Sequence, residues 1–114
     1  MKTSETLSNW LKEIKKKGLD PKVKGLYFGL FESENGYTIY LTGAYSIDSF
    51  EWMLNEDYVA DPKYLNLKSS KKWNVILGDI KNKLIKLLKE DLFDSENIEK
   101  ICIGFDDGDI HFIK

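Results

Sequence analysis

The chain of 114 residues contains no arginine, one cysteine and one histidine. A single cysteine, Cys102, excludes an internal disulfide and a zinc cluster built from thiolates, and it fits a reducing compartment, so we expect a cytoplasmic protein. A single histidine, His111, excludes a metal motif with two histidines. Arginine is the side chain that reads guanine and clamps phosphate with a bidentate fork, so its absence argues against sequence-specific nucleic-acid binding.

Long apolar runs and catalytic signatures are missing as well. No stretch approaches the roughly 20 apolar residues that cross a bilayer, and the N-terminus has no apolar core of the signal-peptide type. We therefore expect neither a membrane span nor export by that route. Glycine-rich phosphate loops and a G-x-S-x-G nucleophile elbow are also absent. The sequence thus predicts a protein that is not an enzyme and that needs no cofactor and no metal.

The composition is sufficient for one folded domain over residues 1–114. The composition is 42% hydrophobic, 13% aromatic and 32% charged, which supplies apolar surface to offset chain entropy. A first helix is expected to end at Gly18 after an apolar stripe spaced as i, i+3, i+4 and i+7. Ser69 or Ser70 is expected to cap a second, longer helix. The apolar face of this helix is made of Trp73, Ile76, Leu77, Ile80, Leu84, Leu87 and Leu88.

A first hairpin is predicted from residues 26–33 and 37–45. Asn35-Gly36 lies between them and favours a two-residue type I′ loop, which would place Leu30 opposite Leu41. The face expected in the core carries Phe28, Leu30, Ile39 and Leu41. The other face carries Tyr27, Phe31, Thr38, Tyr40 and Thr42 and is expected to stay partly exposed.

A second hairpin is predicted from residues 98–105 and 109–113, with Asp107-Gly108 as its turn. In that register Ile103 faces Phe112, and Asp106 lies directly opposite Asp109. Between the hairpins, residues 50–54 alternate like a short strand, and a loop containing Pro62 is expected to follow. The predicted fold is therefore α+β, with a mostly antiparallel sheet of about five strands and two helices packed on one face.

The net charge of −2 hides a segregation of charge along the chain. Residues 25–61 contain seven acidic residues and no lysine, and residues 91–114 contain seven acidic residues and two lysines. The segments before and between them, which include the helices, are rich in lysine. If both helices cover one face, the molecule has a basic helical side and an acidic sheet side. Two interpretations stay open: the pattern keeps the protein soluble, or the acidic side docks a basic partner.

The second hairpin favours the docking interpretation. Carboxylates directly opposite each other destabilise a hairpin by about 0.2–1 kcal/mol. This cost suggests that Asp106 and Asp109 have a function. A calcium loop of the EF-hand kind needs ligands spread over twelve residues, and the run 106–109 does not supply that spacing. Clustered exposed carboxylates instead accelerate association with a basic protein, and Glu56 and Asp57 belong to the same acidic part of the chain.

Two segments carry a family resemblance. Residues 52–65 read Trp-Met-Leu-Asn-Glu-Asp-Tyr-Val-Ala-Asp-Pro-Lys-Tyr-Leu, and residues 103–110 read Ile-Gly-Phe-Asp-Asp-Gly-Asp-Ile. A Trp-x-x-Asn-x-Asp-Tyr stretch with Pro and Tyr behind it, then a helix and a terminal Gly-Phe-Asp-Asp-Gly-Asp hairpin, resembles bacterial immunity proteins of polymorphic or contact-dependent toxin systems. The resemblance covers about the last two thirds of the chain. It implies an antitoxin that binds and blocks a co-produced toxin, often a nuclease, inside the producing cell.

The expected function is therefore neutralisation of a cognate toxin whose active-site surface is basic. The alternative is a small-ligand-binding or regulatory domain that uses the aromatic face of Tyr27, Phe31 and Tyr40. Neither nucleic acid nor a membrane is an expected partner, and the sequence does not define an oligomeric state. The residues expected to contact the toxin are Asp106, Asp107, Asp109, Glu56 and Asp57 for steering, with Trp52 and Tyr40 as anchors.

Overall fold

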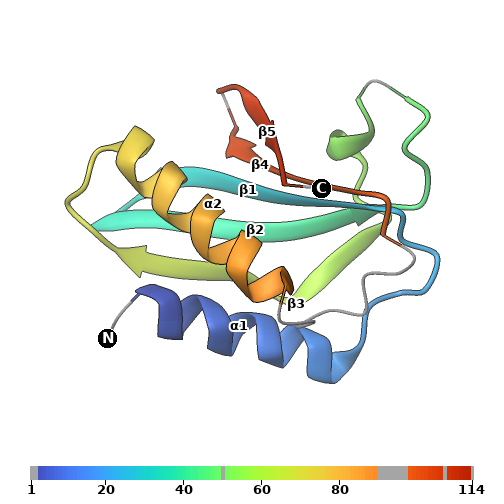
Figure 1. Cartoon of the computed structure of the whole chain (residues 1–114), viewed down its shortest axis with the longest axis horizontal. Helices are drawn as coiled ribbons and strands as arrows, with labels where there is room; N and C mark the ends of the chain where they lie inside the picture. Colours follow the sequence, from blue (N-terminus) through green and yellow to red (C-terminus); the bar gives the residue numbers. More distant parts are fainter. Residues whose placement is uncertain (1–2, 50, 90–97, 107, 114) are drawn as a thin grey trace.

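The computed structural model describes residues 3–49, 51–89, 98–106 and 108–113, and it has the predicted α+β fold. Five strands form one sheet in the order β3-β2-β1-β4-β5, and both helices lie on one of its faces (Figure 1). The pair β1–β4 is parallel and the other three pairs are antiparallel. The elements are α1 (Thr3–Lys17), β1 (Gly25–Ser33), β2 (Gly36–Ala44), the 3-10 helix η1 (Trp52–Leu54), β3 (Tyr58–Lys68), α2 (Trp73–Lys89), β4 (Lys100–Phe105) and β5 (Ile110–Phe112).

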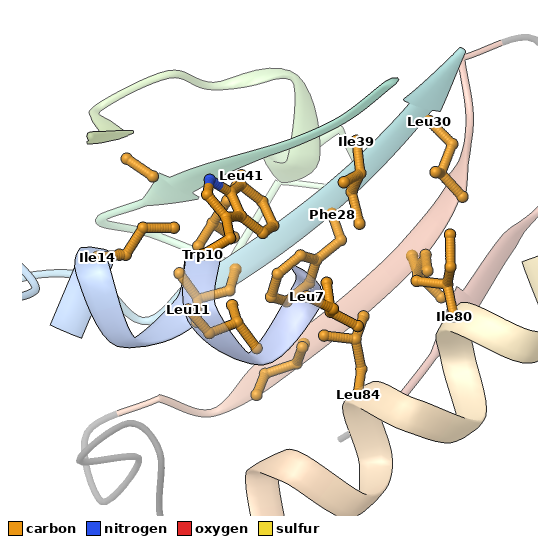
Figure 2. Packing of buried hydrophobic residues seen from close by; sticks show 14 of the residues in the cluster. Leu7, Trp10, Leu11, Ile14, Phe28, Leu30, Ile39, Leu41, Ile80 and Leu84 are labelled. Atoms are coloured by element: carbon orange, nitrogen blue, oxygen red, sulfur yellow. The ribbon is translucent and has the colours of Figure 1, made fainter. Parts of the chain in front are cut away.

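The main hydrophobic core lies between the helices and the sheet. Leu7 of α1 and Leu84 of α2 converge on Phe28 of β1, and none of these three side chains has exposed surface (Figure 2). Burying a side chain of this size stabilises the fold by about 1.5–3 kcal/mol. The predicted core face of the first hairpin is confirmed, because its four residues are fully buried: Phe28, Leu30, Ile39 and Leu41.

Helix α1 is fixed along the edge strand β3. The indole Nε1–H of Trp10 donates a hydrogen bond to the carbonyl oxygen of Pro62 at 2.8 Å. Lys17, in the last turn, forms an ion pair with Asp61 at 2.8 Å. The helix ends as predicted at Gly18, whose φ of 85° lies in the region that favours glycine.

The register of the first hairpin differs from the predicted one by two residues. Leu30 lies opposite Ile39, and the predicted partner Leu41 lies opposite Phe28. Side chains of a strand alternate between its two faces, so a shift of two residues leaves each of them on the predicted face. The core prediction therefore holds although the pairing prediction is wrong.

The shift arises because Asn35 and Gly36 do not form the two-residue loop together, as the sequence predicted. The two-residue loop consists of Glu34 and Asn35, and Asn35 adopts the positive φ of 65°. Gly36 belongs to β2 instead. A Cβ atom on Gly36 would lie 1.9 Å from the carbonyl oxygen of Leu67 in β3, so this position needs glycine for a close approach between strands.

The prediction of a strand over 50–54 followed by a loop is wrong. Residues 52–54 form η1, and β3 follows as an edge strand of 11 residues paired with β2. Pro62 is compatible with this strand because an edge strand has one side without ladder partners and because the pairing with β2 shifts register at this level.

The register of the second hairpin differs from the predicted one by one residue. Ile103 lies opposite His111, where the sequence predicted Phe112. A slip of one residue turns every side chain of β5 to the other face of the sheet. As a result Phe112 is 54% exposed rather than in the core, and Ile110 packs on the face away from the helices.

The connection between β4 and β5 explains this slip. It is longer than a two-residue turn, and the N–H of Gly108 donates a hydrogen bond to the carbonyl oxygen of Phe105 at 3.0 Å. Asp106 and Asp109 are both in this loop and are not cross-strand partners, so the prediction that they face each other is wrong. Asp107 lies outside the described residues.

Helix α2 begins later than predicted. The hydroxyl of Ser69 accepts a hydrogen bond from the N–H of Lys71 in the approach to the helix, and the carbonyl of Lys72 accepts the N–H of Ile76. Trp73, expected in the apolar face, is 54% exposed because it occupies the first position of the helix. The buried part of the predicted face is Ile76, Leu77, Ile80 and Leu84.

Lysines lie along the outer surfaces of both helices, as the charge pattern predicted. Those of α1 are exposed, and those described in α2 are exposed or half-buried. They are Lys12, Lys15, Lys16 and Lys17 in α1 and Lys81, Lys83 and Lys86 in α2. Within the part of the chain that the structure describes, no helix is long and apolar enough to cross a membrane.

Candidate functional site

The face of the sheet turned away from the helices, here called the outer face, carries the predicted aromatic residues. Tyr27 and Phe31 from β1 share it with Tyr40 from β2, as expected, and Tyr64 of β3 lies beside Tyr40 in the ladder. Tyr27 is buried, whereas Phe31 and Tyr40 are half-buried and Tyr64 is 52% exposed. The prediction of a partly exposed face is confirmed for Phe31 and Tyr40 and is wrong for the other three residues, Tyr27, Thr38 and Thr42, which are buried.

Trp52 closes one end of the outer face and is buried there. Its side chain is 3% exposed and packs in a small second core with Tyr27, Ala44 and Cys102. Gly25 provides the space, since a Cβ atom at that position would lie 2.5 Å from the indole ring. Trp52 therefore attaches η1 to the sheet and does not present its ring to a partner, which corrects its predicted role as a surface anchor.

Tyr40 reaches across β1 to the loop after β4. Its ring lies over Gly29, where a Cβ atom would come within 2.1 Å of the ring carbon Cζ. Its hydroxyl donates a hydrogen bond to Oδ1 of Asp106 at 2.5 Å. Gly104 is the β4 partner of Gly29, and its carbonyl oxygen accepts a hydrogen bond from the hydroxyl of Tyr27 at 3.4 Å. Gly29 thus makes room for the Tyr40 ring, whereas a Cβ atom on Gly104 would lie 2.7 Å from the carbonyl oxygen of Asp109.

Both phenols remain protonated at neutral pH. Burial, with a smaller contribution from the charge of Asp106, raises the pKa of Tyr27 to about 12. Burial and the hydrogen bond to Asp106 raise the pKa of Tyr40 far above its usual value. Tyr40 therefore acts as a neutral donor, which orients the Asp106 carboxylate without cancelling its negative charge.

An aromatic row extends from Tyr40 toward the edge of the sheet. The rings of Phe31 and Tyr64 contact edge to face, with centroids 6.4 Å apart, and those of Tyr40 and Tyr64 are 6.2 Å apart. The Lys63 ammonium lies 5.1 Å from the Tyr64 centroid and forms an ion pair with Glu56 at 3.1 Å. The hydrogen bond to Glu56 raises the pKa of Lys63. Glu56, predicted to steer a partner, is therefore neutralised by a neighbouring lysine.

Ion pairs remove part of the predicted negative surface. Exposed pairs of this kind contribute little to stability, about 0–1 kcal/mol, but each one cancels a charge on the surface. Glu56, Asp61 and Glu99 are each paired with a lysine, so the sheet side is less negative than its sequence suggests. The pairs among the described residues are Glu56–Lys63, Asp61–Lys17, Glu99–Lys24 and Asp79–Lys71.

Five exposed carboxylates near η1 and in the loop after β4 form no ion pair with a lysine among the described residues, and we call them the lysine-free carboxylates. The Asp57 carboxylate accepts a hydrogen bond from the backbone N–H of Tyr45 at 3.0 Å, a neutral donor like the one at Asp106. The other three members, at the same two places, are exposed as well, and none of them forms an ion pair with a lysine within the described ranges. The set is Asp48, Glu51, Asp57, Asp106 and Asp109.

Cysteine and histidine, two residue types often used in catalysis, occur once each, and both lie on the strands at one side of the sheet. Burial raises the pKa of the Cys102 thiol to about 12, so it stays protonated and unreactive at neutral pH. His111 is half-buried on the strand β5. Among the residues described, no three side chains of His, Cys, Asp or Glu come together in a group that could hold a metal ion.

Several residues of this site escaped the sequence analysis. Asp48 and Glu51 were counted in an acidic segment but not selected, and Lys63 and Tyr64 were assigned to a loop. Glycine inside a strand often marks a place where another group approaches the backbone closely. Gly29, in the middle of an otherwise regular strand pattern, was therefore a signal that could have located the Tyr40 ring.

The segments that resemble immunity proteins, 52–65 and 103–110, come together on the outer face. Trp52 from the first and Ile110 from the second pack on the same small core, and Tyr64 contacts the ring of Tyr40, which binds Asp106. Comparisons with protein-family models, curated protein sequences and solved structures gave no significant match. Function is therefore inferred from the chemistry of this chain alone.

Proposed function

We propose that this chain is an immunity protein that binds a cognate bacterial toxin inside the producing cell and blocks its basic active-site surface. The observation that carries the proposal is the set of lysine-free carboxylates at two separate places next to the outer face. Asp48, Glu51 and Asp57 flank η1, which Trp52 attaches to that face, and Asp106 is bound there by Tyr40. The two helices, whose lysines are exposed or half-buried where described, form the opposite layer of the molecule (Figure 1).

This arrangement suits an inhibitor of a protein that handles nucleic acid. A nuclease holds phosphates with cationic side chains, so an acidic surface is attracted to its active site and covers it. Charges at the rim of such an interface mainly raise the association rate and select the partner. Carboxylates held by neutral donors, as at Asp57 and Asp106, are oriented before the partner arrives, and less side-chain entropy is lost on binding.

The aromatic row supplies the apolar contact that charge alone does not give. Tyr64 is half exposed next to the half-buried rings of Phe31 and Tyr40. Tyrosines and other aromatic side chains are enriched among the residues that dominate interface energies. We therefore assign Tyr64 and Tyr40 as anchors in place of Trp52.

A protection assay tests the proposal. The product of the gene next to the one that encodes this chain is expressed in a bacterial host under an inducible promoter, with and without this chain. The proposal predicts that the product alone stops growth and that co-expression restores it. It also predicts that the two proteins elute together as a complex in size-exclusion chromatography.

A variant with Asp48→Asn, Glu51→Gln and Asp109→Asn is the informative comparison in this assay. It should protect less well at equal expression, while circular dichroism shows an unchanged fold. A neighbouring product that is harmless, or a toxic one against which this chain gives no protection, would show that the proposed function is wrong.

A further inference from the structure

A groove lies where β4 ends beside β1, and we call it the strand-end groove. It has a volume of about 850 Å³. Its apolar part is formed by Leu30, Phe31, Phe105 and Trp73, and acidic residues border it. The peptide N–H of Asp106 donates a hydrogen bond to the carbonyl oxygen of Leu30 at 3.1 Å, which fixes the start of the loop against β1. The groove thus has a defined backbone on one side and the first turn of α2 on the other.

Trp73 forms an exposed aromatic wall of this groove. Its ring contacts Phe105 edge to face, with centroids 5.8 Å apart and planes at 82°, so Phe105 holds its orientation. The side chain is nevertheless 54% exposed. More than half of the Trp73 surface is therefore open to a ligand, and the face of a Trp ring attracts a cation more strongly than those of Tyr and Phe.

Three carboxylates border the same groove, and Lys81 lines the adjoining hollow between Trp73 and Asp109 rather than the groove itself. Glu32, Asp106 and Asp109 are all exposed, and the described residues that line the groove include no lysine. None of these carboxylates forms an ion pair within the described part of the chain. An apolar floor, an indole wall and a negative rim are complementary to a side chain with a long apolar stem and a cationic end.

We infer that the strand-end groove accepts an arginine side chain from the protein partner. A guanidinium group stacks on an aromatic face and pairs with carboxylates in a fork, and it is more weakly hydrated than an ammonium, so it enters such a groove more readily than lysine does. This chain contains no arginine of its own to fill the groove. The inference rests on the proposed function in one respect, the choice of a basic protein as partner.

The test uses the whole protein and a small probe, so it does not depend on the toxin. N-acetyl-arginine methylamide is titrated into the ¹⁵N-labelled protein, and the shifts of the Trp73 indole N–H and of the Phe105 and Gly108 amides are followed by NMR. The inference predicts saturable shifts at these positions in the millimolar range. N-acetyl-citrulline methylamide, which has a neutral side chain of the same shape, should bind at least tenfold more weakly, and the lysine analogue should be intermediate.

Two single variants with the same net charge show where the arginine probe binds. Asp109→Asn should lower the affinity for the arginine probe about three- to tenfold. Asp79→Asn should leave this affinity unchanged, because Asp79 lies in α2 outside the groove and is paired with Lys71. Equal binding of arginine and citrulline, an undisturbed Trp73 signal, or equal effects of the two variants would overturn the inference. If the probe fails while the protection assay succeeds, the groove assignment is wrong and the immunity function stands; the reverse result leaves an arginine site without a toxin.

Discussion

Tyr40 and Asp106 are joined by a hydrogen bond of 2.5 Å that crosses β1, although β2 and the loop after β4 are not neighbours in the sheet. The bond connects the first hairpin to the second on the outer face. It passes over Gly29, which has no side chain to block the Tyr40 ring. This contact fixes the position of a carboxylate that borders both the outer face and the strand-end groove.

A double-mutant cycle measures how much this contact stabilises the fold. Tyr40→Phe removes the donor, Asp106→Ala removes the acceptor, and the double variant removes both. We expect a coupling free energy of about 1 kcal/mol, typical of a hydrogen bond that is not fully buried. Urea unfolding of the four proteins gives this value, and additive effects of the two changes would show that the bond does not stabilise the native state.

Replacement of Gly29 tests the packing of the Tyr40 ring. A Cβ atom at Gly29 meets the ring at 2.1 Å, so Gly29→Ala should lower the free energy of unfolding by roughly 1–3 kcal/mol, the usual cost of overpacking. Gly78→Ala is the matched control, because its Cβ meets no atom within 4 Å in the middle of α2, and it should stabilise the protein by up to about 1 kcal/mol. The loss caused by Gly29→Ala should shrink when Tyr40 is also alanine, and an undiminished loss would mean that the ring is not the obstacle.

Alkaline pH should destabilise the protein through Cys102. The thiol pKa is about 12 in the folded state against an ordinary value of 9.0, so folding favours the protonated thiol. Stability from this group is fully present below pH 9 and is lost as pH rises toward 12, with a slope of at most about 1.4 kcal/mol per pH unit. Tyr27, whose pKa is raised from 10.0 to about 12, contributes mainly above pH 10, and so do the other tyrosines with a raised pKa, Tyr40, Tyr45 and Tyr58.

The difference between the wild type and Cys102→Ala across the interval from pH 9 to pH 10 isolates the cysteine. In Cys102→Ala the free energy of unfolding should fall less across this interval than in the wild type, and Tyr27→Phe should change the slope mainly above it. Chemical denaturation at pH 7, 9, 10 and 11 provides the comparison. Parallel curves for the wild type and Cys102→Ala would show that the thiol is not buried in the native protein.

Local patterns in the sequence were sufficient for the helices and the core but not for the pairing of strands. The alternation around Phe28 and Leu41 identified the core face, and a register error of two residues did not disturb it. At the second hairpin an error of one residue moved Phe112 out of the core, because the loop is longer than the Asp-Gly signal implies. The parallel pairing of β1 with β4 joins residues far apart in the sequence and has no local signature.

The sequence predicted the kinds of side chain at the candidate site better than it predicted the individual residues. Tyr40, Asp57, Asp106 and Asp109 lie at the predicted surface, but an ion pair with Lys63 removed Glu56 from the charged set, and Trp52 proved to be buried. Lys63 is seven residues from Glu56 and lies in β3, which the sequence alone did not predict. The alternation of Leu65 and Leu67 with polar neighbours was the signal that could have identified this strand.

The association rate with the toxin tests most directly whether the location of charge controls binding. Two triple variants raise the net charge equally: Asp48→Asn, Glu51→Gln and Asp109→Asn change lysine-free carboxylates, whereas Glu56→Gln, Asp61→Asn and Asp79→Asn change carboxylates paired with lysine. Stopped-flow measurements from low to high salt should show a rate that falls with salt for the wild type. The first variant should associate about tenfold more slowly at low salt and depend less on salt, while the second stays within about twofold of the wild type. A rate that is independent of salt, or equal slowing by both variants, would contradict the account.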